Sequence, residues 1–399
     1  MEAKQVSLDS QTRSFISRHT TDDVRMLALQ AAKYPEINIQ AAIIQISGRQ
    51  AATDKIPSWT VIDELIYPSH LSMEQCSSEA TARYKAELVG DGNTFADLTG
   101  GFGIDCAFIA QGFRTATYVE QQEELCLIAN HNFPLLGKGH ICVVNADGGE
   151  YLRKMDTVDW IFIDPARRTL EGNKAIAISD CTPNVTALES LFLQKAKHTM
   201  IKLSPMLDIA QALHELSSVH QVHVISVGGE CKELLLVLNP NHHEGITIHC
   251  VNILKNGTRQ SFVFNKDEES NAPCTYSSQP GTYLYEPNAS ILKAGAYRSI
   301  AHSFQLFKLH PNSHLYTSNK LIPDFPGRVF RCESSFSLNK KEIRAHLSGL
   351  KQANLTVRNF PATVNELRKR LKLSDGGNIY LFATTLADEQ KIIIRCSKI

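Results

Sequence analysis

Acidic side chains stand at the ends of a series of short apolar runs between residues 93 and 240 of this 399-residue chain. Asp97, Glu120, Asp147 and Asp164 each end or closely follow a run rich in Val, Ile, Leu or Phe. A carboxylate accepts hydrogen bonds from hydroxyl and amino groups. The carboxyl ends of parallel strands meet at one crevice, where doubly wound sheets bind ligands. The spacing therefore predicts an acceptor-rich pocket for a polar ligand.

A glycine-rich loop, Asp97-Leu98-Thr99-Gly100-Gly101-Phe102-Gly103, follows the first of these runs. Glycine lets the backbone turn tightly and approach a ligand that a Cβ atom would push away. A dinucleotide fingerprint read from Gly101 would need glycine or alanine at position 106, where Cys106 stands. The loop is expected to bind a ligand other than a dinucleotide, and a purely structural tight turn is the alternative. The candidate ligand contacts in it are Asp97, Thr99, Gly100, Gly101 and Gly103.

Two further carboxylates fit the parts of a nucleoside. Glu120 stands 23 residues after Asp97, near the offset at which an acidic side chain accepts hydrogen bonds from both ribose hydroxyls. Asp147 can accept from the exocyclic amine of an adenine ring. A solvated carboxylate at a strand end is the alternative for Glu120, and a turn-forming Asp-Gly pair is the alternative for Asp147.

A second set of side chains is of the types that can bind a substrate and transfer protons in a group-transfer reaction. Asp164 begins the segment Asp164-Pro165-Ala166-Arg167-Arg168, in which proline stiffens the turn and can hold the carboxylate toward the crevice. Arg167 and Arg168 suit a phosphate-bearing substrate or a surface ion pair. Lys202 ends another apolar run, and Glu230 begins the last one. Such groups can transfer protons, so Asp164, Lys202 and Glu230 are the candidate catalytic residues; structural ion pairs are the alternative.

These residues require strands that alternate with helices. Short β-branched runs separated by helix-length segments are typical of parallel strands with crossover helices. The last two runs are too close for a crossover helix, so they are expected to form an antiparallel hairpin at the edge of the sheet. The strands are predicted at 94–98, 115–119, 141–145, 159–163, 199–203, 222–226 and 233–238. The fold class is therefore α/β, a doubly wound, seven-stranded Rossmann-like sheet.

Other modules are expected on both sides of this core. Residues 1–90 have helical apolar spacing, with a break at Lys55-Ile56-Pro57-Ser58-Trp59. The core spans 91–240, and 241–325 is expected to hold a hairpin, a polar linker at 266–271 and a new module from about Thr282. Residues 326–399 have the strand and helix order of a small α+β domain.

The ordered motifs resemble those of class I S-adenosylmethionine-dependent methyltransferases. The glycine loop, Glu120, Asp147 and Asp164-Pro165-Ala166-Arg167 match motifs I to IV in order and spacing. A closer resemblance, to bacterial methyltransferases with a C-terminal THUMP-like domain, rests on Gln75 to Lys85, Glu230-Cys231-Lys232-Glu233 and Glu286 to Gly295. The resemblance covers nearly the whole chain. It implies S-adenosylmethionine as cofactor, a small ferredoxin-like segment before the THUMP-like domain, and an RNA substrate.

The sequence leaves undecided which atom of the substrate accepts the methyl group. Amino-methylating relatives have a second proline and an aromatic residue where Ala166 and Arg167 stand, whereas Lys85, Asp164, Lys202 and Glu230 follow the chain order of ribose 2′-O-methyltransferases. A base amine and a ribose hydroxyl are both candidates. The alternatives to methyl transfer are a non-catalytic RNA-binding or assembly protein that retains the pocket, and a nicotinamide-dependent oxidoreductase, which Cys106 and the terminal hairpin disfavour.

The uneven distribution of charge along the chain suggests which kind of molecule the protein binds. Residues 328–399 hold 14 Lys plus Arg and 6 Asp plus Glu, a net charge of +8, so the rest of the neutral chain carries −8. Such a basic module is expected to meet phosphates, or to be a solvated surface. The candidate RNA contacts are Arg167, Arg168, Arg368, Lys369, Arg370 and Lys372.

The remaining composition argues against membranes and metals. No apolar run approaches the roughly 20 residues of a membrane-spanning helix, and no apolar leader is evident, so a cytoplasmic protein is expected. The 10 cysteines include no C-x-x-C pair, which predicts reduced thiols and no metal site. Cys106, Cys126, Cys142 and Cys231 are expected to be buried in apolar segments.

Overall fold

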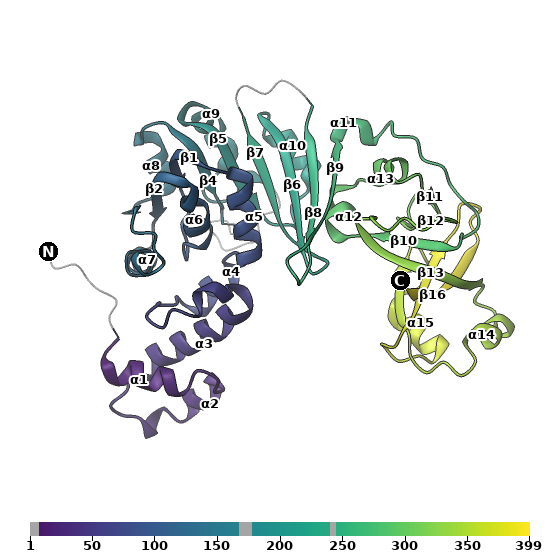
Figure 1. Ribbon diagram of the computed structural model, residues 1–399, viewed down its shortest axis with the longest axis horizontal. Coiled ribbons are helices and arrows are strands. Elements are labelled where there is room, and N and C mark those ends of the chain that lie inside the picture. Colours follow the sequence, from purple (N-terminus) through teal and green to yellow (C-terminus); the bar gives the residue numbers. More distant parts are fainter. Residues whose placement is uncertain (1–7, 167–177, 240–244) are drawn as a thin grey trace. The chain divides into compact units, whose positions relative to one another are not determined.

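A computed structural model describes residues 8–166, 178–239 and 245–399 of the chain (Figure 1). The chain divides into two compact units. The first unit consists of residues 1–220 and 235–242, and the second of residues 221–234 and 243–399. Among the described residues, no helix is both long enough and apolar enough to cross a membrane.

The first unit begins with helices that are capped by short polar side chains. Asp9, Asp23, Asn38 and Ser78 each accept a hydrogen bond from a backbone N–H in the first turn that follows them, which satisfies a donor that the helix leaves unpaired. Pro57 follows the longest helix and begins a short 3-10 turn, as the sequence predicts. These helices are α1 (Ser10–Arg18), α2 (Val24–Leu29), α3 (Ile39–Lys55), α4 (His70–Gln75) and α5 (Glu79–Val89).

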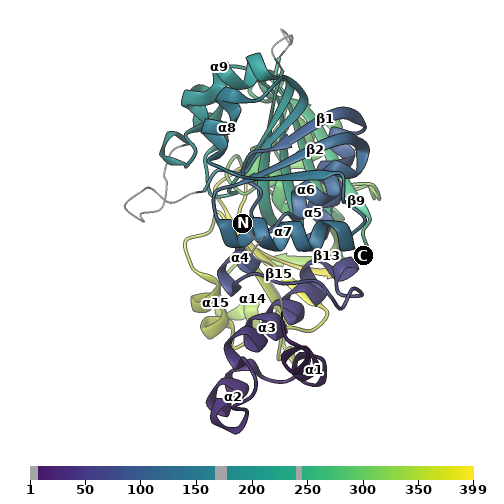
Figure 2. The ribbon, with the colours of Figure 1, turned by 90° about the vertical axis from the view of Figure 1, so that its left-hand side faces the viewer.

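Five parallel strands then form the part of the sheet that carries the site. They are β1 (Gly92–Asp97), β2 (Phe113–Glu120), β3 (Ile141–Asn145), β4 (Val158–Ile163) and β5 (Ala196–Leu203). β1 pairs with β2 on one side and β4 on the other, so the strand order reverses at β1, which gives the crevice in which doubly wound sheets bind ligands. Figure 2 shows α8 and α9 on one face of these strands and α5 and α6 on the other. The intervening helices are α6 (Ile104–Ile109), α7 (Glu123–Leu135), α8 (Gly148–Lys154), α9 (Val185–Lys195) and α10 (Ile209–Glu215).

The sheet is larger than the sequence predicts. Its described strands follow the order β3-β2-β1-β4-β5-β7-β6-β8-β9, so it has nine strands where seven were expected. The turn Gly228-Gly229, with φ of 59° and 89°, joins β6 to β7 as a tight hairpin. This hairpin is not at the edge, because β8 pairs in parallel with β6 and β9 pairs with β8 in antiparallel register. These strands are β6 (Val219–Val227), β7 (Glu230–Leu238), β8 (Thr247–Ile253) and β9 (Arg259–Asn265).

The second unit contains a separate sheet of seven described strands, in the order β11-β12-β10-β13-β16-β15-β14. Its strands are β10 (Tyr283–Pro287), β11 (Phe307–Lys308), β12 (Tyr316–Ser318), β13 (Gly327–Phe336), β14 (Asn354–Arg358), β15 (Ile379–Thr385) and β16 (Lys391–Lys398). The helices of this region are α11 (Lys266–Glu269), α12 (Ala289–Ala294), α13 (Ser299–Ser303), α14 (Lys340–Leu347) and α15 (Val364–Leu371). One apolar core includes Leu284, Phe330 and Phe382, and another includes Leu367, Leu371 and Leu381.

Two local predictions are wrong. The polar stretch 266–271 was expected to be a linker, but Asn265 accepts a hydrogen bond from the backbone N–H of Asp267 and caps the short helix α11. Cys142 was expected to be buried, but it is exposed, because β3 is the edge strand of its sheet and one of its faces meets solvent.

Candidate functional site

The glycine loop begins where β1 ends, beside the carboxyl end of β4. The Asp97 Oδ1 atom accepts a hydrogen bond of 3.0 Å from the Thr99 backbone N–H. The Thr99 hydroxyl in turn accepts one of 2.6 Å from the Asp164 backbone N–H. The structure therefore brings together the loop after β1 and the Asp164 turn, which the sequence assigns to cofactor and catalysis.

The three glycines of the loop meet different physical requirements. A Cβ atom on Gly100 would lie 2.1 Å from the Tyr118 ring, so this glycine allows close packing against β2. Gly101 and Gly103 have φ of 54° and 87°, which favour glycine, and Gly103 precedes the first turn of α6. A Cβ atom on Gly101 would meet nothing closer than 3.9 Å, so this side of the loop is open. Packing thus explains Gly100, and an open backbone surface is left at Gly101.

Glu120, at the end of β2, is fixed by backbone donors. Its Oε2 atom accepts a hydrogen bond of 3.0 Å from the Gly101 N–H, and its Oε1 atom accepts one of 2.8 Å from the Gln122 N–H. Only 8% of the residue surface is exposed. Because each carboxylate oxygen has more than one acceptor position, a fixed acceptor remains for a ligand with two neighbouring hydroxyl groups.

Asp97 has a buried oxygen that lacks a partner among the described residues. Its Oδ2 atom makes no hydrogen bond there, and the residue is 1% exposed. Burial raises the pKa of this carboxyl group well above its usual range, since little compensates for the lost hydration of the charged form. A ligand with a positive or hydrogen-bond-donating group would supply the missing partner.

Asp147 has a structural role in the fold. Its Oδ1 atom accepts a hydrogen bond of 2.9 Å from the Glu150 N–H and caps α8. The adjacent Gly148 packs so closely that a Cβ atom would lie 2.1 Å from the Leu98 carbonyl oxygen, at the start of the glycine loop. The capping role explains the Asp-Gly pair, and the contact with an adenine amine stays a prediction.

A buried chain of alternating charges lies behind Asp164. The Lys202 Nζ atom is 2.5 Å from Asp164 Oδ2 and 3.7 Å from Asp105 Oδ2. The Lys85 Nζ atom is 3.1 Å from Asp105 Oδ1, and the Lys85 side chain is completely buried. The Ser77 hydroxyl donates to Asp105 Oδ2 at 2.6 Å. The structure therefore joins two of the three predicted catalytic residues, Asp164 and Lys202, and connects them through Asp105 to Lys85.

Asp105 is the functional candidate that sequence reasoning missed. Burial acts to raise the pKa of this carboxyl group, but Lys85, Lys202 and the Ser77 hydroxyl outweigh it, so that its pKa is lowered. One sequence signal was present, because Asp105 is an acidic residue in the first turn of the helix that follows the glycine loop.

The remaining catalytic and arginine candidates are not part of this described cluster. Glu230 begins β7 in the second unit, is largely exposed, and forms an ion pair of 2.6 Å with Lys232. Its catalytic role stays a prediction. Arg167 and Arg168 lie outside the described residues. In the part of the chain that the structure describes, no three His, Cys, Asp or Glu side chains are grouped to hold a metal ion.

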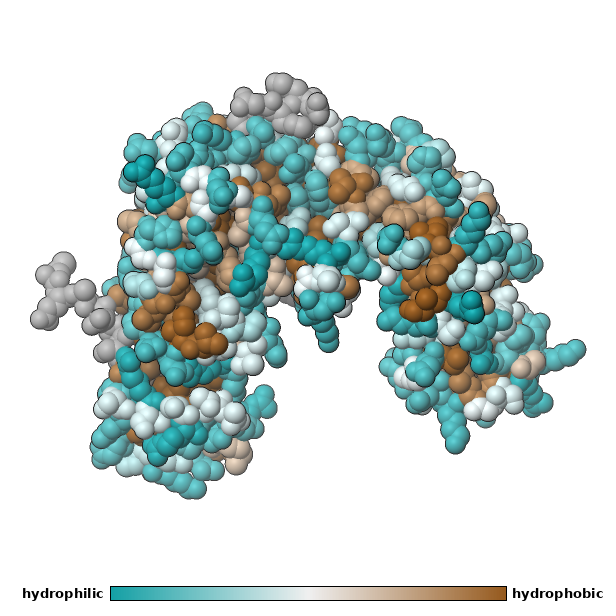
Figure 3. All heavy atoms as spheres, in the orientation of Figure 1, coloured by the Kyte–Doolittle hydropathy of each residue, from teal (hydrophilic) through white to brown (hydrophobic). Residues whose placement is uncertain are grey.

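The other four predicted RNA contacts, Arg368, Lys369, Arg370 and Lys372, lie on α15 and just after it. Arg368 forms an ion pair with Asp375, and Arg370 donates a hydrogen bond of 2.8 Å to the Leu338 carbonyl oxygen. Lys372 ends the helix in the left-handed conformation, with φ of 55°. In Figure 3, the visible surface of the region that contains α14 and α15 is mostly hydrophilic. Two of the four cations therefore also have local partners in the domain.

Comparison with known proteins identifies the class. An uncharacterized S-adenosylmethionine-dependent methyltransferase of Mycobacterium tuberculosis is 22% identical over 324 residues, which cover 80% of this chain and 82% of the relative. The fold matches the crystal structure of a putative methyltransferase from Porphyromonas gingivalis W83 with a TM-score of 0.86. The doubly wound sheet, its glycine loop and these similarities define an S-adenosylmethionine-dependent methyltransferase.

The family follows from the same comparisons. The Porphyromonas gingivalis protein is 34% identical, and the match covers 97% of each chain. A ferredoxin-like domain model matches residues 283–326, and a THUMP domain-like model matches residues 327–398. The chain therefore belongs to the family of this methyltransferase, with a THUMP-like domain at its C-terminal end.

The hydrogen-bond acceptors of the site fit S-adenosylmethionine. The cofactor has an ammonium group, two neighbouring ribose hydroxyls and an adenine amine, all of which donate hydrogen bonds. The site offers an unpaired buried carboxylate oxygen on Asp97, a fixed carboxylate on Glu120 and the open backbone at Gly101. When bound, the cofactor supplies an electrophilic methyl group on a sulfonium centre.

Proposed function

We propose that this methyltransferase acts on RNA. The observation that carries the proposal is the match of residues 327–398 to a THUMP domain-like model, within a segment that has a net charge of +8. THUMP domains accompany RNA-modifying enzymes, and a concentrated positive charge is the electrostatic signature of a surface that meets phosphates. The methyltransferase unit supplies the reaction, and the basic module supplies substrate affinity.

The alternating charges of Asp164, Lys202 and Asp105 favour a nitrogen atom as the methyl acceptor. Lys202 lies 2.5 Å from Asp164 and 3.7 Å from Asp105, so it is an ammonium group between two carboxylates. An ammonium group has no lone pair with which to remove a proton from a ribose hydroxyl. Asp164 can instead accept a hydrogen bond from an amino group and orient its nitrogen, while the ion pair with Lys202 holds this carboxylate in place. We therefore assign Asp164 to orientation of the acceptor and Lys202 to stabilisation of Asp164.

Methyl transfer from labelled cofactor tests the proposed substrate. RNA isolated from cells that lack the protein should accept label from the purified wild-type enzyme, whereas RNA from cells that contain it should accept little, because its sites are already modified. Mass spectrometry of the nucleosides then identifies the methylated atom. Label on a ribose would refute the nitrogen assignment alone. Label that enters protein or small molecules but not RNA would refute the RNA proposal.

A charge-matched pair of triple variants tests the docking surface. Replacement of Arg368, Lys369 and Arg370 by alanine removes three positive charges from α15. Replacement of three cations on α14 removes the same charge from a neighbouring helix and serves as the control: Lys340, Lys341 and Arg344. For each RNA phosphate that the protein no longer neutralises, the log–log salt dependence of single-strand binding should become flatter by about 0.7.

We expect the α15 variant to bind RNA more weakly at low salt than the α14 variant, with a flatter salt dependence. Its affinity for S-adenosylmethionine should stay at the wild-type value, because the cofactor site lies in the other unit. If the two triple variants lose the same affinity, binding depends on net charge alone and α15 is not the docking surface. If neither variant loses affinity, the basic module is a solvated surface.

A further inference from the structure

Two cysteines face each other across neighbouring strands of the THUMP-like domain. Cys332 on β13 is directly opposite Cys396 on β16 in the antiparallel register. Cys396 belongs to an apolar core of this domain and Cys332 packs against the same core, so both side chains lie on one face of the sheet. Opposed residues in antiparallel strands have Cα atoms about 4.5 to 5.5 Å apart, which lies within the range that a disulfide bond spans. The pairing of Cys332 with Cys396 is therefore compatible with a disulfide bond between them.

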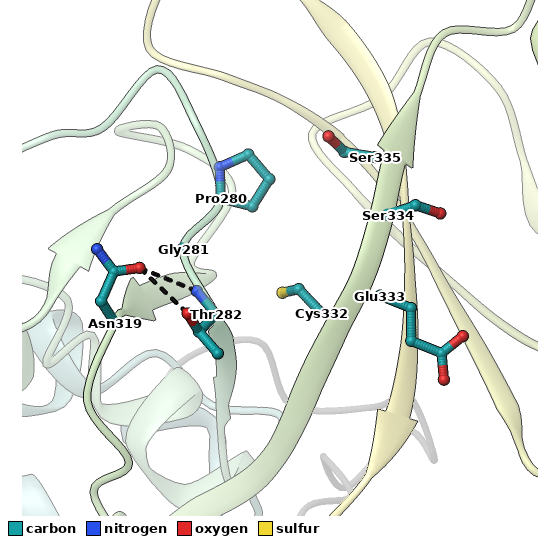
Figure 4. Close-up of a pocket in the computed structure, with 8 residues that line it drawn as sticks. All are labelled: Pro280, Gly281, Thr282, Asn319, Cys332, Glu333, Ser334 and Ser335. Carbon is teal, nitrogen blue, oxygen red and sulfur yellow. Dashed lines mark hydrogen bonds between the residues drawn. The ribbon is translucent and has the colours of Figure 1, made fainter.

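The two thiols differ in access. Cys396 is completely buried and belongs to the apolar core around Phe330 and Phe382. Cys332 is only partly buried and lines a pocket of about 340 Å³ (Figure 4). The pocket exists because the last residue of β13 to pair with β10 is Arg331, so that β13 continues beyond the end of its neighbour. One thiol of the pair can thus meet a small molecule, and the other lies behind it.

The pocket is polar. Its other lining residues are Pro280, Gly281, Thr282, Asn319, Glu333, Ser334 and Ser335. Figure 4 shows the Cys332 sulfur in the space beside β13, across from Thr282, where Asn319 accepts hydrogen bonds of 3.1 and 3.4 Å from the Thr282 backbone and hydroxyl. Amide and hydroxyl groups at this opening suit a polar, peptide-like ligand.

We propose that Cys332 and Cys396 form a thiol–disulfide exchange site that reacts with low-molecular-weight disulfides. The Cys332 thiolate attacks one sulfur of the small disulfide, which breaks its S–S bond, forms a mixed disulfide and releases one thiolate. Cys396 then loses its proton and attacks the Cys332 sulfur, which forms the Cys332–Cys396 bond and releases the second thiol. The protein loses two protons and two electrons, and the small disulfide gains both.

The electrostatics of the pair agree with this order of events. The neighbouring Cys396 side chain lowers the pKa of the Cys332 thiol, and the Cys332 side chain together with burial raises the pKa of Cys396. The accessible sulfur is therefore the one with the greater thiolate character, and the thiolate is the attacking species.

The bond would close a loop that contains most of the THUMP-like domain. Residues 333–395 lie between the two cysteines and include α14, β14, α15 and β15. A disulfide that closes a long loop restricts the unfolded chain and stabilises the folded one. Oxidation should therefore raise the thermal stability of this domain and hold in place the strands that support α15.

Incubation of the reduced full-length protein with glutathione disulfide tests the proposal. Peptide mapping without reductant should show the Cys332 and Cys396 peptides joined, and the melting temperature should rise and return after reduction. Cys142 is the internal control, because it is exposed and Thr117, not a cysteine, stands opposite it. It should keep a glutathione adduct.

Two variants separate the steps. Cys396→Ser should stop at a stable glutathione adduct on Cys332, and Cys332→Ser should leave Cys396 unmodified. The proposal is overturned if wild-type Cys332 retains its adduct while Cys396 stays reduced, or if Cys332 does not react under conditions that modify Cys142. Both of these outcomes are read in the wild-type chain, so they do not depend on the folding of either variant.

Discussion

The buried ion pair between Lys85 and Asp105 allows a direct test of how much the buried charges behind Asp164 stabilise the fold. Replacement of Asp105 by asparagine keeps the shape of the side chain and an oxygen for the Ser77 hydroxyl, but it removes the negative charge 3.1 Å from Lys85 and 3.7 Å from Lys202. Lys85 has no exposed side-chain surface, so water cannot replace the lost carboxylate without rearrangement of the fold.

The size of the effect follows from these distances. With an effective dielectric constant of about 20, the attraction at 3.1 Å is about 5 kcal/mol and the attraction at 3.7 Å is about 4 kcal/mol. Relief from burying the carboxylate offsets part of this sum. Breaking a buried pair by removal of one partner is typically destabilising by about 3 to 5 kcal/mol, and this is the expected loss for Asp105→Asn. For a unit of this size, the melting temperature should fall by about 6 to 20 °C.

Urea unfolding at neutral pH measures this loss. Asp63→Asn is the matched control, since Asp63 forms an ion pair of 2.7 Å with Arg49 but its side chain is 87% exposed. An exposed pair contributes at most about 1 kcal/mol. The double change of Asp105→Asn and Lys85→Met should recover part of the stability, because it removes the buried ammonium group together with the carboxylate that faces it. Equal losses for Asp105→Asn and Asp63→Asn, or no recovery in the double variant, would refute the argument.

Three other changes address the cofactor, the reaction and the pH dependence of stability. Glu120→Ala should weaken S-adenosylmethionine binding by about 1.5 to 3 kcal/mol, the contribution of a hydrogen bond to a charged group, whereas calorimetry that shows a change below about 0.5 kcal/mol would exclude the ribose contact. Asp164→Ala should lower kcat far more than cofactor affinity; an unchanged kcat in the methyl-transfer assay would remove Asp164 from the reaction. The Lys197 ammonium lowers the pKa of Asp159 from 3.8 to about 2, despite some opposing desolvation, so this carboxylate stabilises the fold above pH 3.8 and the effect is lost as the pH falls toward 2. Asp159→Asn should therefore cost about 1 to 2 kcal/mol at pH 7 and less at pH 3 by urea unfolding, and a loss independent of pH would contradict the ionic cause.

The sequence predicts the parts of the fold that depend on local pattern. All seven predicted strands of the core are present, because each is a short run of β-branched and apolar residues between turn signals. The addition of β8 and β9 to the same sheet was missed, since strand pairing joins segments far apart in the chain and leaves no local signal. The exposure of Cys142 was missed for the same reason: an edge position depends on which strands pair.

In the site, too, the features with a local sequence signal were predicted and those that depend on distant residues were not. The contacts of Glu120 with the glycine loop and of Asp164 with Thr99 agree with the strand-end rule, which brings together the carboxyl ends of parallel strands. Asp105 was not identified, because its importance depends on Lys85 and Lys202, which lie 20 and 97 residues away in the sequence. The sequence offered a structural alternative for Asp147, a turn-forming Asp-Gly pair, and the structure shows a structural role of another kind, the cap of α8.

The hydrogen bonds of the glycine loop have a consequence for the entropy of cofactor binding. The Tyr118 hydroxyl donates to the Gly101 carbonyl oxygen at 2.5 Å, and the Gly101 N–H donates to Glu120. The loop is therefore tied to β2 by the chain's own groups, and folding has already fixed its backbone. A ligand that meets a preformed loop does not lose affinity to the ordering of that segment. Loss of the Tyr118 hydroxyl, which is bonded to the Gly101 carbonyl oxygen and to neither Asp97 nor Glu120, should consequently make the entropy of binding less favourable.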